Sequence, residues 1–390
     1  MKRALILDAN QRSALAVTRS LGKQGIPVFT ADESSTALAG CSRFSEKYFI
    51  YPSPRCHPDH FVASITSLVK DQHIDILLPM TELTTTLLLA KQTLFNGTVI
   101  PCPDIETIDP LADKCSLMRL AETLNITTPH TWFVDIPATL PCDLEKITYP
   151  IVLKPGKSWL YQNGQWARFS VKTANTPSEA RQILNSDPAF ISHPFMIQEF
   201  ISGHGQGVFA LYNNNRAVSF FSHRRIREKP PSGGVSVLSE SIKVDQELQT
   251  ATRLLLDNAG WHGVAMVEFK IAEDGTAYLM EVNTRFWGSL QLAIDAGIDF
   301  PYLLYKIACG DKVETISSYK TGKRLRWLLG DLDSLYLTLR GRQYSIRGKF
   351  MTLLQFITPG PFRTRHEINR LDDLGPFWHE LKDYVRAIIR

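Results

Sequence analysis

The chain has 390 residues, 44% hydrophobic and 21% charged, so it is far too apolar to be intrinsically disordered. Its net charge of only +4 argues against a dedicated nucleic-acid-binding protein. No run approaches 18 uncharged apolar residues, which argues against a membrane-spanning helix. The six cysteines include no CxxC pair, which favours a reducing, cytoplasmic location.

The positive charge is concentrated in one segment. Residues 311–390 contain 15 Lys and Arg against 9 Asp and Glu, a net charge of +6, so residues 1–310 carry −2. This basic segment is either ordinary solvated surface or a surface that attracts acidic substrates or lipid headgroups.

The N-terminal part alternates strand-like and helix-like segments. Residues 3–8 and 26–31 are apolar and strand-like, a helical pattern lies between them, and a helix near 58–71 precedes a strand at 74–79. Such alternation predicts a doubly wound parallel sheet, whose ligands gather at the carboxyl ends of the strands. Four polar residues there are candidates either for lining a cleft or for capping loops: Asp8, Asn10, Thr81 and Glu82.

After residue 108 the pattern changes to hairpins mixed with helices. Asp109 and Pro110 predict the start of a helix that carries Lys114. We therefore expect a multi-lobed protein that combines α/β and α+β architecture. The predicted domains are a Rossmann-like sheet at 1–108, a two-lobed domain at 109–310 with its cleft between lobes near 109–200 and 201–310, and a small basic extension at 311–390.

The sequence predicts a β-hairpin near the middle of the chain. Two strand-like runs, 263–271 and 276–285, flank Asp274 and Gly275, a pair typical of two-residue turns. The length of the turn fixes which residues of the two strands lie opposite each other, and a one-residue bulge would shift that pairing.

This hairpin carries the residues with the clearest chemistry. A two-residue turn places Glu268 directly opposite Glu281, and it puts Asn283 and Arg285 on the same face. Opposed carboxylates repel unless a cation offsets them, and oxygen donors suit Mg²⁺. The alternative is a solvated polar face on an ordinary hairpin.

The run LMEVNTRFWGS, residues 279–289, resembles the metal-binding strand of ATP-grasp enzymes, notably biotin carboxylases and carbamoyl phosphate synthetases. The likeness covers roughly residues 110–300, and it extends more loosely to the N-terminal sheet. It implies a pre-ATP-grasp sheet followed by a two-lobed ATP-grasp domain that uses ATP with Mg²⁺, or with Mn²⁺ as an alternative. The resemblance assigns the metal to Glu268, Glu281 and Asn283, and it places Arg285 at the transferred phosphoryl group or the substrate carboxylate.

Two lysines resemble the phosphate-binding lysines of this family. Lys154 ends the apolar strand of YPIVLKPG, and Lys114 lies on the preceding helix. On spacing alone, a surface lysine is the favoured interpretation of Lys154, and Lys114 has the same alternative. The loop after Lys154 lacks the glycine cluster that covers phosphates in many members, so Lys157 and Ser158 are candidates for that role.

The predicted strand 195–199 enters a hinge, residues 198–201, that resembles the adenine clamp of ATP-grasp enzymes. Adenine is bound there by backbone N–H and C=O groups, so the side chains can vary. The resemblance assigns the nucleotide to Gln198, Glu199, Phe200 and Ile201, and Glu199 could also reach the ribose.

A third group is an arginine-rich strand. Alternation along it predicts that Arg225 and Arg227 share one face with His223, and a glycine-containing loop at 229–237 follows. Guanidinium groups suit carboxylates and phosphates, and the alternative is an exposed basic strand. Similar runs occur in uncharacterised ATP-grasp ligases, and this resemblance assigns both arginines to the substrate.

The resemblance implies a ligase that activates a carboxylate as an acyl phosphate, couples it to an amine, and releases ADP and phosphate. Three alternatives remain: a carboxylase acting on a biotin-like carrier, a phosphotransferase acting on a hydroxyl, and a nucleotide-binding module without turnover. The expected partners are small-molecule carboxylates and amines, and a homo-oligomer is compatible with the sequence. The expected catalytic residues are Lys154, Arg225, Arg227 and Arg285.

Overall fold

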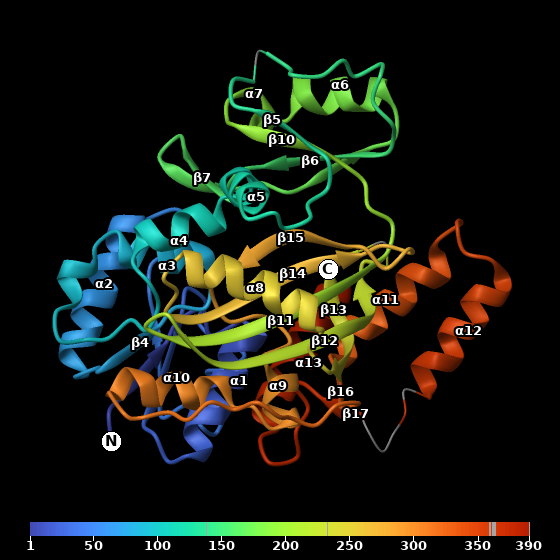
Figure 1. Cartoon of the computed structure of the whole chain (residues 1–390). Helices are drawn as coiled ribbons and strands as arrows, with labels where there is room; N and C mark the ends of the chain where they lie inside the picture. Colours follow the sequence, from blue (N-terminus) through green and yellow to red (C-terminus); the bar gives the residue numbers. More distant parts are fainter. Residues whose placement is uncertain (138, 232, 359, 361–363, 390) are drawn as a thin grey trace.

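The computed structural model describes residues 1–137, 139–231, 233–358, 360 and 364–389, and Figure 1 shows how its elements are arranged. Within these residues, three sheets of at least four strands and one separate hairpin form the β-structure. No helix in this part of the chain combines the length and hydrophobicity that crossing a membrane requires.

The N-terminal sheet is parallel and covered on both faces. Its elements are β1 (Ala4–Ile6), α1 (Arg12–Lys23), β2 (Val28–Asp32), β3 (Lys47–Ile50), α2 (Pro58–Asp71), β4 (Ile76–Leu78), α3 (Glu82–Leu89) and the 3₁₀ helix η1 (Gln92–Phe95). The strand order is β3-β2-β1-β4. Leu5 belongs to one apolar cluster with Phe61 of α2, whereas Ile6 belongs to another with Leu15 of α1. The predicted doubly wound sheet is therefore confirmed.

Helices α4 (Ile105–Ala112) and α5 (Lys114–Thr123) follow this sheet, and they correct one prediction. Pro110 lies inside α4, so Asp109 and Pro110 do not start the helix that carries Lys114. That helix starts at Lys114 and is capped by Asp113, whose carboxylate accepts the backbone N–H of Ser116 at 2.9 Å.

An antiparallel sheet forms the upper lobe in Figure 1. Its elements are β5 (Thr131–Val134), β6 (Ile151–Pro155), β9 (Lys172–Ala174), α6 (Pro177–Ser186), α7 (Pro188–Ile191) and β10 (Phe195–Glu199), with the separate hairpin β7 (Trp159–Gln162) and β8 (Gln165–Arg168). The strand order is β5-β10-β6-β9. Ile151 and Leu153 pack with Ala180 and Phe190 of the two helices, so only the other face of the sheet is available to a ligand.

A seven-stranded sheet lies below this lobe. Its elements are β11 (His204–Asn213), β12 (Arg216–Lys229), β13 (Val235–Ile242), α8 (Gln246–Asn258), β14 (Gly263–Ile271), β15 (Ala277–Asn283), α9 (Leu290–Ala296), α10 (Phe300–Cys309), β16 (Arg324–Arg326) and β17 (Thr364–His366). The order is β15-β14-β11-β12-β13-β16-β17. Its apolar residues share clusters with those of the N-terminal sheet, for example Phe209 with Ile6, so the two sheets are packed into a common core.

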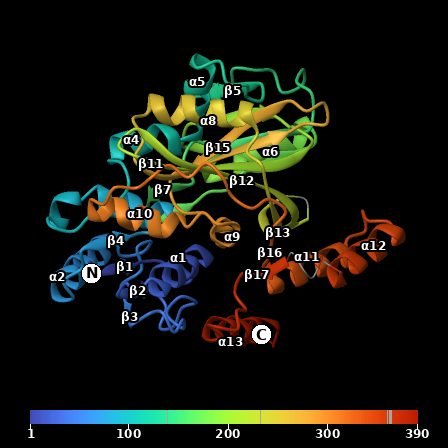
Figure 2. The ribbon, with the colours of Figure 1, turned by 60° about the horizontal axis from the view of Figure 1, so that its bottom comes forward.

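The segment 311–390 contributes to the large sheet through β16 and β17, and it adds three helices: α11 (Leu328–Arg340), α12 (Ile346–Ile357) and α13 (Gly375–Ile389). Figure 2 shows α13 beside the N-terminal sheet and α12 projecting away from it. The domain boundaries near residues 108 and 310 stay predictions.

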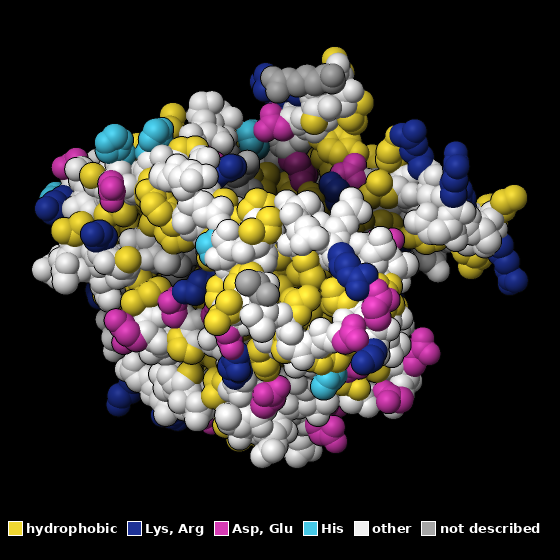
Figure 3. Space-filling view, turned by 90° about the horizontal axis from the view of Figure 1, so that it is seen from above, with side chains coloured by type: hydrophobic (Ala, Val, Ile, Leu, Met, Phe, Trp, Pro, Cys, Tyr) yellow, Lys and Arg dark blue, Asp and Glu magenta, His cyan; other side chains and the backbone are white. Residues whose placement is uncertain are grey.

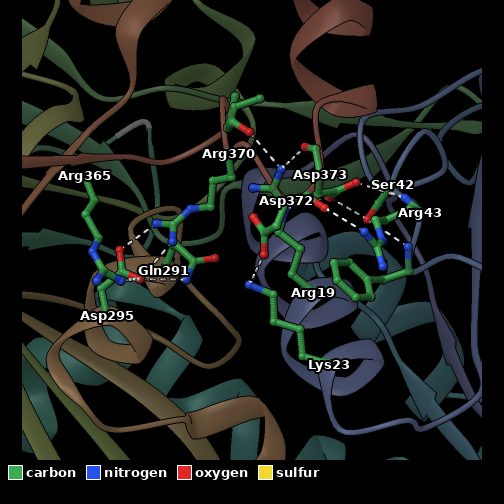
Figure 4. Close-up of polar contacts among 12 residues, drawn as sticks. Arg19, Lys23, Ser42, Arg43, Gln291, Asp295, Arg365, Arg370, Asp372 and Asp373 are labelled. Atoms are coloured by element: carbon green, nitrogen blue, oxygen red, sulfur yellow. Dashed lines mark hydrogen bonds and ion pairs between the residues drawn. The ribbon is translucent and has the colours of Figure 1, made fainter.

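The chain before α13 is attached to the N-terminal sheet by a buried ion pair (Figure 4). Asp373 accepts hydrogen bonds from Arg19 Nε at 2.8 Å, Ser42 Oγ at 2.7 Å and the backbone N–H of Arg43 at 2.9 Å. The two charged side chains are only 3% and 1% exposed. Arg19 also donates to backbone oxygens in the segment 367–368, so the polar groups of the pair have partners on both sides.

Removing the Asp373 carboxylate should therefore destabilise the fold. Asp373→Ala leaves Arg19 buried without its anion, and such a loss lowers the free energy of unfolding by about 3–5 kcal/mol. The adjacent Asp372 pairs with Lys23 at 2.7 Å, but these side chains are 50% and 44% exposed. Asp372→Ala should therefore cost less than about 1 kcal/mol. Urea denaturation measures both variants, and equal losses would contradict the role of burial.

Candidate active site

A cavity of about 670 Å³ lies between the upper lobe and the seven-stranded sheet, within the size range of small-molecule sites. More cationic than anionic side chains line it, which favours a polyanionic ligand. The lining cations are Arg12, Lys114, Lys154, Arg168, Arg225, Lys270 and Arg285, and the lining carboxylates are Glu199, Glu228, Glu268 and Glu281.

Glu268 and Glu281 lie directly opposite each other on β14 and β15, so the predicted opposition is confirmed. Asn283, two residues further along β15, donates its side-chain amide to Glu281 Oε1 at 3.0 Å. Arg285 Nη2 lies 3.4 Å from Asn283 Oδ1. The hairpin thus brings these four side chains together at one wall of the cavity.

The turn of this hairpin differs from the prediction. Three residues, 273–275, separate Ala272 from Thr276, and the N–H of Ala272 donates to the carbonyl oxygen of Thr276 at 2.9 Å. A three-residue loop shifts the pairing of the strands by one residue relative to a two-residue turn.

A bulge in β15 reverses that shift. Phe269 pairs with Leu279, while Glu268 pairs with Glu281, so Met280 is the extra residue between the two pairs. The longer turn and the bulge therefore shift the register in opposite directions, so Glu268 and Glu281 remain opposite each other. The bulge also leaves Leu279 fully buried in the core and Met280 in the wall of the cavity.

Burial and neighbouring charges set the ionisation of the pair. Burial raises the pKa of Glu268, although Arg225 Nη2 lies 2.6 Å from Glu268 Oε2. Burial also acts on Glu281, but Lys114 and the amide of Asn283 outweigh it, so the pKa of Glu281 lies below its ordinary value. The pKa values of the two carboxylates are therefore shifted in opposite directions.

The potential metal ligands on Glu268, Glu281 and Asn283 are oxygen atoms, which suit a hard cation such as Mg²⁺ better than a soft one. Among the described residues, no group of three or more His, Cys, Asp and Glu side chains is placed to hold a metal ion by itself. A cation between Glu268 and Glu281 would therefore need the Asn283 oxygen and ligand or water oxygens to complete its coordination.

Both predicted phosphate lysines reach the cavity, and Lys157 does not. Lys154 is only 6% exposed, and burial lowers its pKa to about 8. Lys114, the first residue of α5, donates from Nζ to Ser158 Oγ at 3.0 Å. Lys157 instead pairs with Asp109 at 2.8 Å.

The predicted adenine clamp, 198–201, is divided between the cavity and the interior of the lobe. Glu199 and the two residues after it line the cavity. Gln198 is 1% exposed, and its Nε2 donates to Thr131 Oγ1 at 2.8 Å, so this side chain joins β10 to β5. Glu199 Oε1 accepts the backbone N–H of His130 at 3.0 Å.

The structure places the two predicted substrate arginines, Arg225 and Arg227, in different surroundings. A bulge at Ile226 shifts the pairing of β12 with β13, so Arg225 and Arg227 do not share one environment. Arg225 enters the cavity between Glu268 and Glu228. Arg227 lies outside the cavity lining and donates from Nε and Nη2 to the carboxylate of Asp331, both at 2.6 Å. The geometry thus offers no support for its predicted contact with a substrate.

Arg12 and Arg168 also line the cavity, although neither belonged to the predicted site. The Arg12 guanidinium lies 4.2 Å from the ring centroid of Trp327 and pairs with Glu367. No local motif marks either arginine, because each is brought to the cavity by tertiary packing of segments far apart in the sequence.

Of the four polar residues at the strand ends, Glu82 comes closest to the site. It lines a small side pocket together with Lys114, Glu281 and Arg285, and burial raises its pKa. The other three satisfy local structure. Asp8 accepts the backbone N–H of Met80, Asn10 accepts that of Leu38, and Thr81 caps α3.

The overall fold of this chain is similar to those of several solved enzyme structures. The biotin carboxylase domain of 2-oxoglutarate carboxylase from Hydrogenobacter thermophilus, solved with MgADP, ADP and bicarbonate, has a TM-score of 0.64. Its sequence is 14% identical, over 83% of this chain and 73% of that chain. L-amino acid ligase from Bacillus licheniformis has a TM-score of 0.61. Its sequence is 16% identical, over 80% of this chain and 75% of that chain. N5-carboxyaminoimidazole synthetase from Staphylococcus aureus has a TM-score of 0.64. Its sequence is 13% identical, over 83% of this chain and 82% of that chain.

Residues 192–330 match a family described as ATP-grasp in the biosynthetic pathway with Ter operon. This range spans β10 to β16, and it therefore includes the strands that carry Arg225, Glu268 and Glu281. No match was found among curated protein sequences. Residues 192–330 are therefore similar to an ATP-grasp family, and the chain as a whole shares the fold of these solved structures.

Replacing Lys154 by Met should stabilise the folded protein at neutral pH. The pKa of Lys154 falls from 10.5 to about 8 because burial disfavours the ammonium form. Met keeps a similar apolar stem without the charge, so we expect a gain of about 1–3 kcal/mol in the free energy of unfolding near pH 7.

That gain should depend on pH. Between the folded pKa of about 8 and the unfolded pKa of 10.5, the unfolded chain binds more protons at this group than the folded chain. The wild-type protein is therefore stabilised relative to the variant as pH rises through this window, and the gain shrinks. Urea denaturation at about pH 7 and about pH 10 tests this, with Lys157→Met as the control for an exposed lysine. An identical gain at both pH values would contradict the assignment.

Proposed function

We propose that this chain is an ATP-dependent ligase that activates a carboxylate as an acyl phosphate and couples it to an amine. The proposal depends on the opposed carboxylates Glu268 and Glu281, which share one cavity with Lys114, Lys154 and Arg285. A carboxylate pair surrounded by cations suits a nucleoside triphosphate with its divalent cation. MgADP and bicarbonate in one structural neighbour, and the name ligase in another, support the same class of reaction.

The cavity suggests how ATP would be bound. Its phosphates would lie at Lys154 and Lys114, where an anion would favour the charged form of the buried Lys154 amine. Its adenine would be bound by the backbone of 199–201, because the side chain of Gln198 is already bonded to Thr131.

Glu268, Glu281 and the side-chain oxygen of Asn283 would hold Mg²⁺, which would neutralise negative charge on the phosphates. Two observations fit this assignment: the opposed carboxylates are buried, and the side-chain amide of Asn283 lies beside Glu281. Arg225 is bonded to Glu268 in the structure, so a substrate carboxylate would compete with Glu268 for the same guanidinium group.

The proposed chemistry follows from the poor reactivity of a carboxylate, whose leaving group would be oxide. A carboxylate oxygen attacks the γ-phosphorus of ATP, the bond to the β,γ-bridging oxygen breaks, and ADP leaves. The amine nitrogen then attacks the acyl carbon, phosphate leaves, and the nitrogen loses a proton. In this scheme Lys154 and Arg285 oppose the charge on the transferred group, and Arg225 orients the carboxylate.

Hydroxylamine should trap the acyl phosphate. The protein is incubated with ATP, Mg²⁺, hydroxylamine and a carboxylate library, and hydroxamates are identified by mass spectrometry. With the correct carboxylate, we expect one hydroxamate for each ADP and transfer of a heavy-oxygen label from the carboxylate to phosphate. Formation of AMP, or phosphate without the label, would reject the mechanism.

Glu281→Gln is the matched control for this reaction. It should lower turnover of Mg-ATP by about 100-fold or more while circular dichroism shows an intact fold.

The alternative functions predict different results with the wild-type protein. Bicarbonate alone would sustain full ATP hydrolysis in a carboxylase, a hydroxyl compound would become phosphorylated by a phosphotransferase, and a binding module would retain ATP without hydrolysing it.

Arg225 and Arg227 should now have separable effects. Arg225→Ala should raise the KM for the carboxylate by about tenfold or more and change the KM for ATP less, because its guanidinium group is assigned to the substrate. Arg227→Ala should lower the melting temperature, because it removes a partner of Asp331, which is 1% exposed, and should leave both KM values nearly unchanged. A KM effect of Arg225→Ala confined to ATP would move this residue to the nucleotide site.

A further inference from the structure

Helices α11 and α12 form a projecting helical arm, residues 328–357, on the side of the molecule away from α2 (Figures 1 and 2). Helix α11 packs on the large sheet through residues such as Leu335, whereas no side chain of α12 is buried. An amphipathic helix without a covered face is unusual in a globular fold, because most helices gain stability by burying their apolar face.

The apolar residues of α12 form a stripe at helical spacing. Ile346, Phe350, Leu353 and Ile357 follow one another at intervals of three and four residues, and they are 88%, 58%, 37% and 65% exposed. The ring of Phe356, on another face of the helix, lies 4.2 Å from the guanidinium carbon of Arg326. Because that face is turned to the protein, the apolar stripe is turned to solvent.

The charge around this stripe has one sign. Residues 334–358 contain Arg340, Arg342, Arg347 and Lys349 and no Asp or Glu. On a helix of 3.6 residues per turn, Arg347 and Lys349 flank the stripe on its two sides. Figure 3 shows Lys and Arg side chains beside hydrophobic ones on the outer part of the arm.

We propose that the helical arm docks onto the surface of an anionic lipid bilayer. The stripe would enter the boundary between headgroups and acyl chains, and the four cations would contact lipid phosphates. A second copy of the chain is a poorer occupant, because two arms would bring like charges together without an opposing carboxylate in either 334–358 segment. The contact is peripheral, since no helix among the described residues can span a bilayer.

The base of the arm is rigidly attached to the protein. Asp331 accepts hydrogen bonds from Arg227 and Arg326 at 2.6 Å. The same two arginines donate to the backbone oxygens of Gln355 and Phe356, at 3.4 and 2.9 Å, at the C-terminal end of α12. A docked arm would therefore hold the strand that carries Arg225, and with it the cavity, in a fixed orientation to the lipid surface.

Cosedimentation with vesicles tests the proposal. The whole chain should bind vesicles of phosphatidylcholine and phosphatidylglycerol, bind phosphatidylcholine vesicles far more weakly, and lose affinity as salt is added. The double variant Arg342→Gln/Arg347→Gln should lower the partition coefficient by about 30-fold, from about one kcal/mol per charge. Ile346→Ser/Phe350→Ser should lower it by at least about tenfold.

The matched control is Lys70→Gln/Lys91→Gln, which removes two charges from exposed lysines of the region around α2 and η1. It should bind as the wild type does, and all variants should keep the wild-type melting temperature, since the changed side chains are exposed. The proposal is overturned by failure to bind anionic vesicles at low salt, or by arm variants that bind as well as the control. It is equally overturned if ultracentrifugation finds a dimer that Phe350→Ser dissociates, because a second copy would then cover the stripe.

Discussion

Two carboxylates facing each other in a buried position impose a constraint that the surrounding structure must satisfy. Glu268 and Glu281 repel, and burial makes their charge more costly still. Cations that offset this repulsion come from both sides of the cavity: Arg225 from the large sheet, Lys154 from the upper lobe, and Lys114 from the helix between them. The same charges that balance the carboxylates are thus available to a bound polyanion.

Continuous apolar runs made much of the architecture predictable. The strands at 195–199 and 263–271 have the predicted bounds, because a run of buried residues between turn signals allows few other structures. The doubly wound sheet was predictable for the same reason. The helix that carries Lys114 was placed with the wrong first residue, because Pro110 is tolerated inside α4 and the cap is Asp113.

The candidate site was harder to predict because bulges depend on the partner strand. Met280 and Ile226 are both extra residues in their ladders, and neither is marked in the local sequence. The first compensates for a longer turn and leaves the carboxylates opposed, whereas the second separates Arg227 from Arg225. Arg12 reaches the cavity through packing of distant segments, which a single sequence does not reveal.

The ion pair between Arg19 and Asp373 joins residues that are 354 positions apart. On the ribosome, the N-terminal sheet emerges first, and domains generally begin to fold as they leave the exit tunnel. Until Asp373 has been translated, α1 contains an arginine whose buried position lacks its counterion. The N-terminal sheet can therefore reach its final stability only after the segment around Asp373 has been translated, and it remains exposed to chaperones and proteases during that interval.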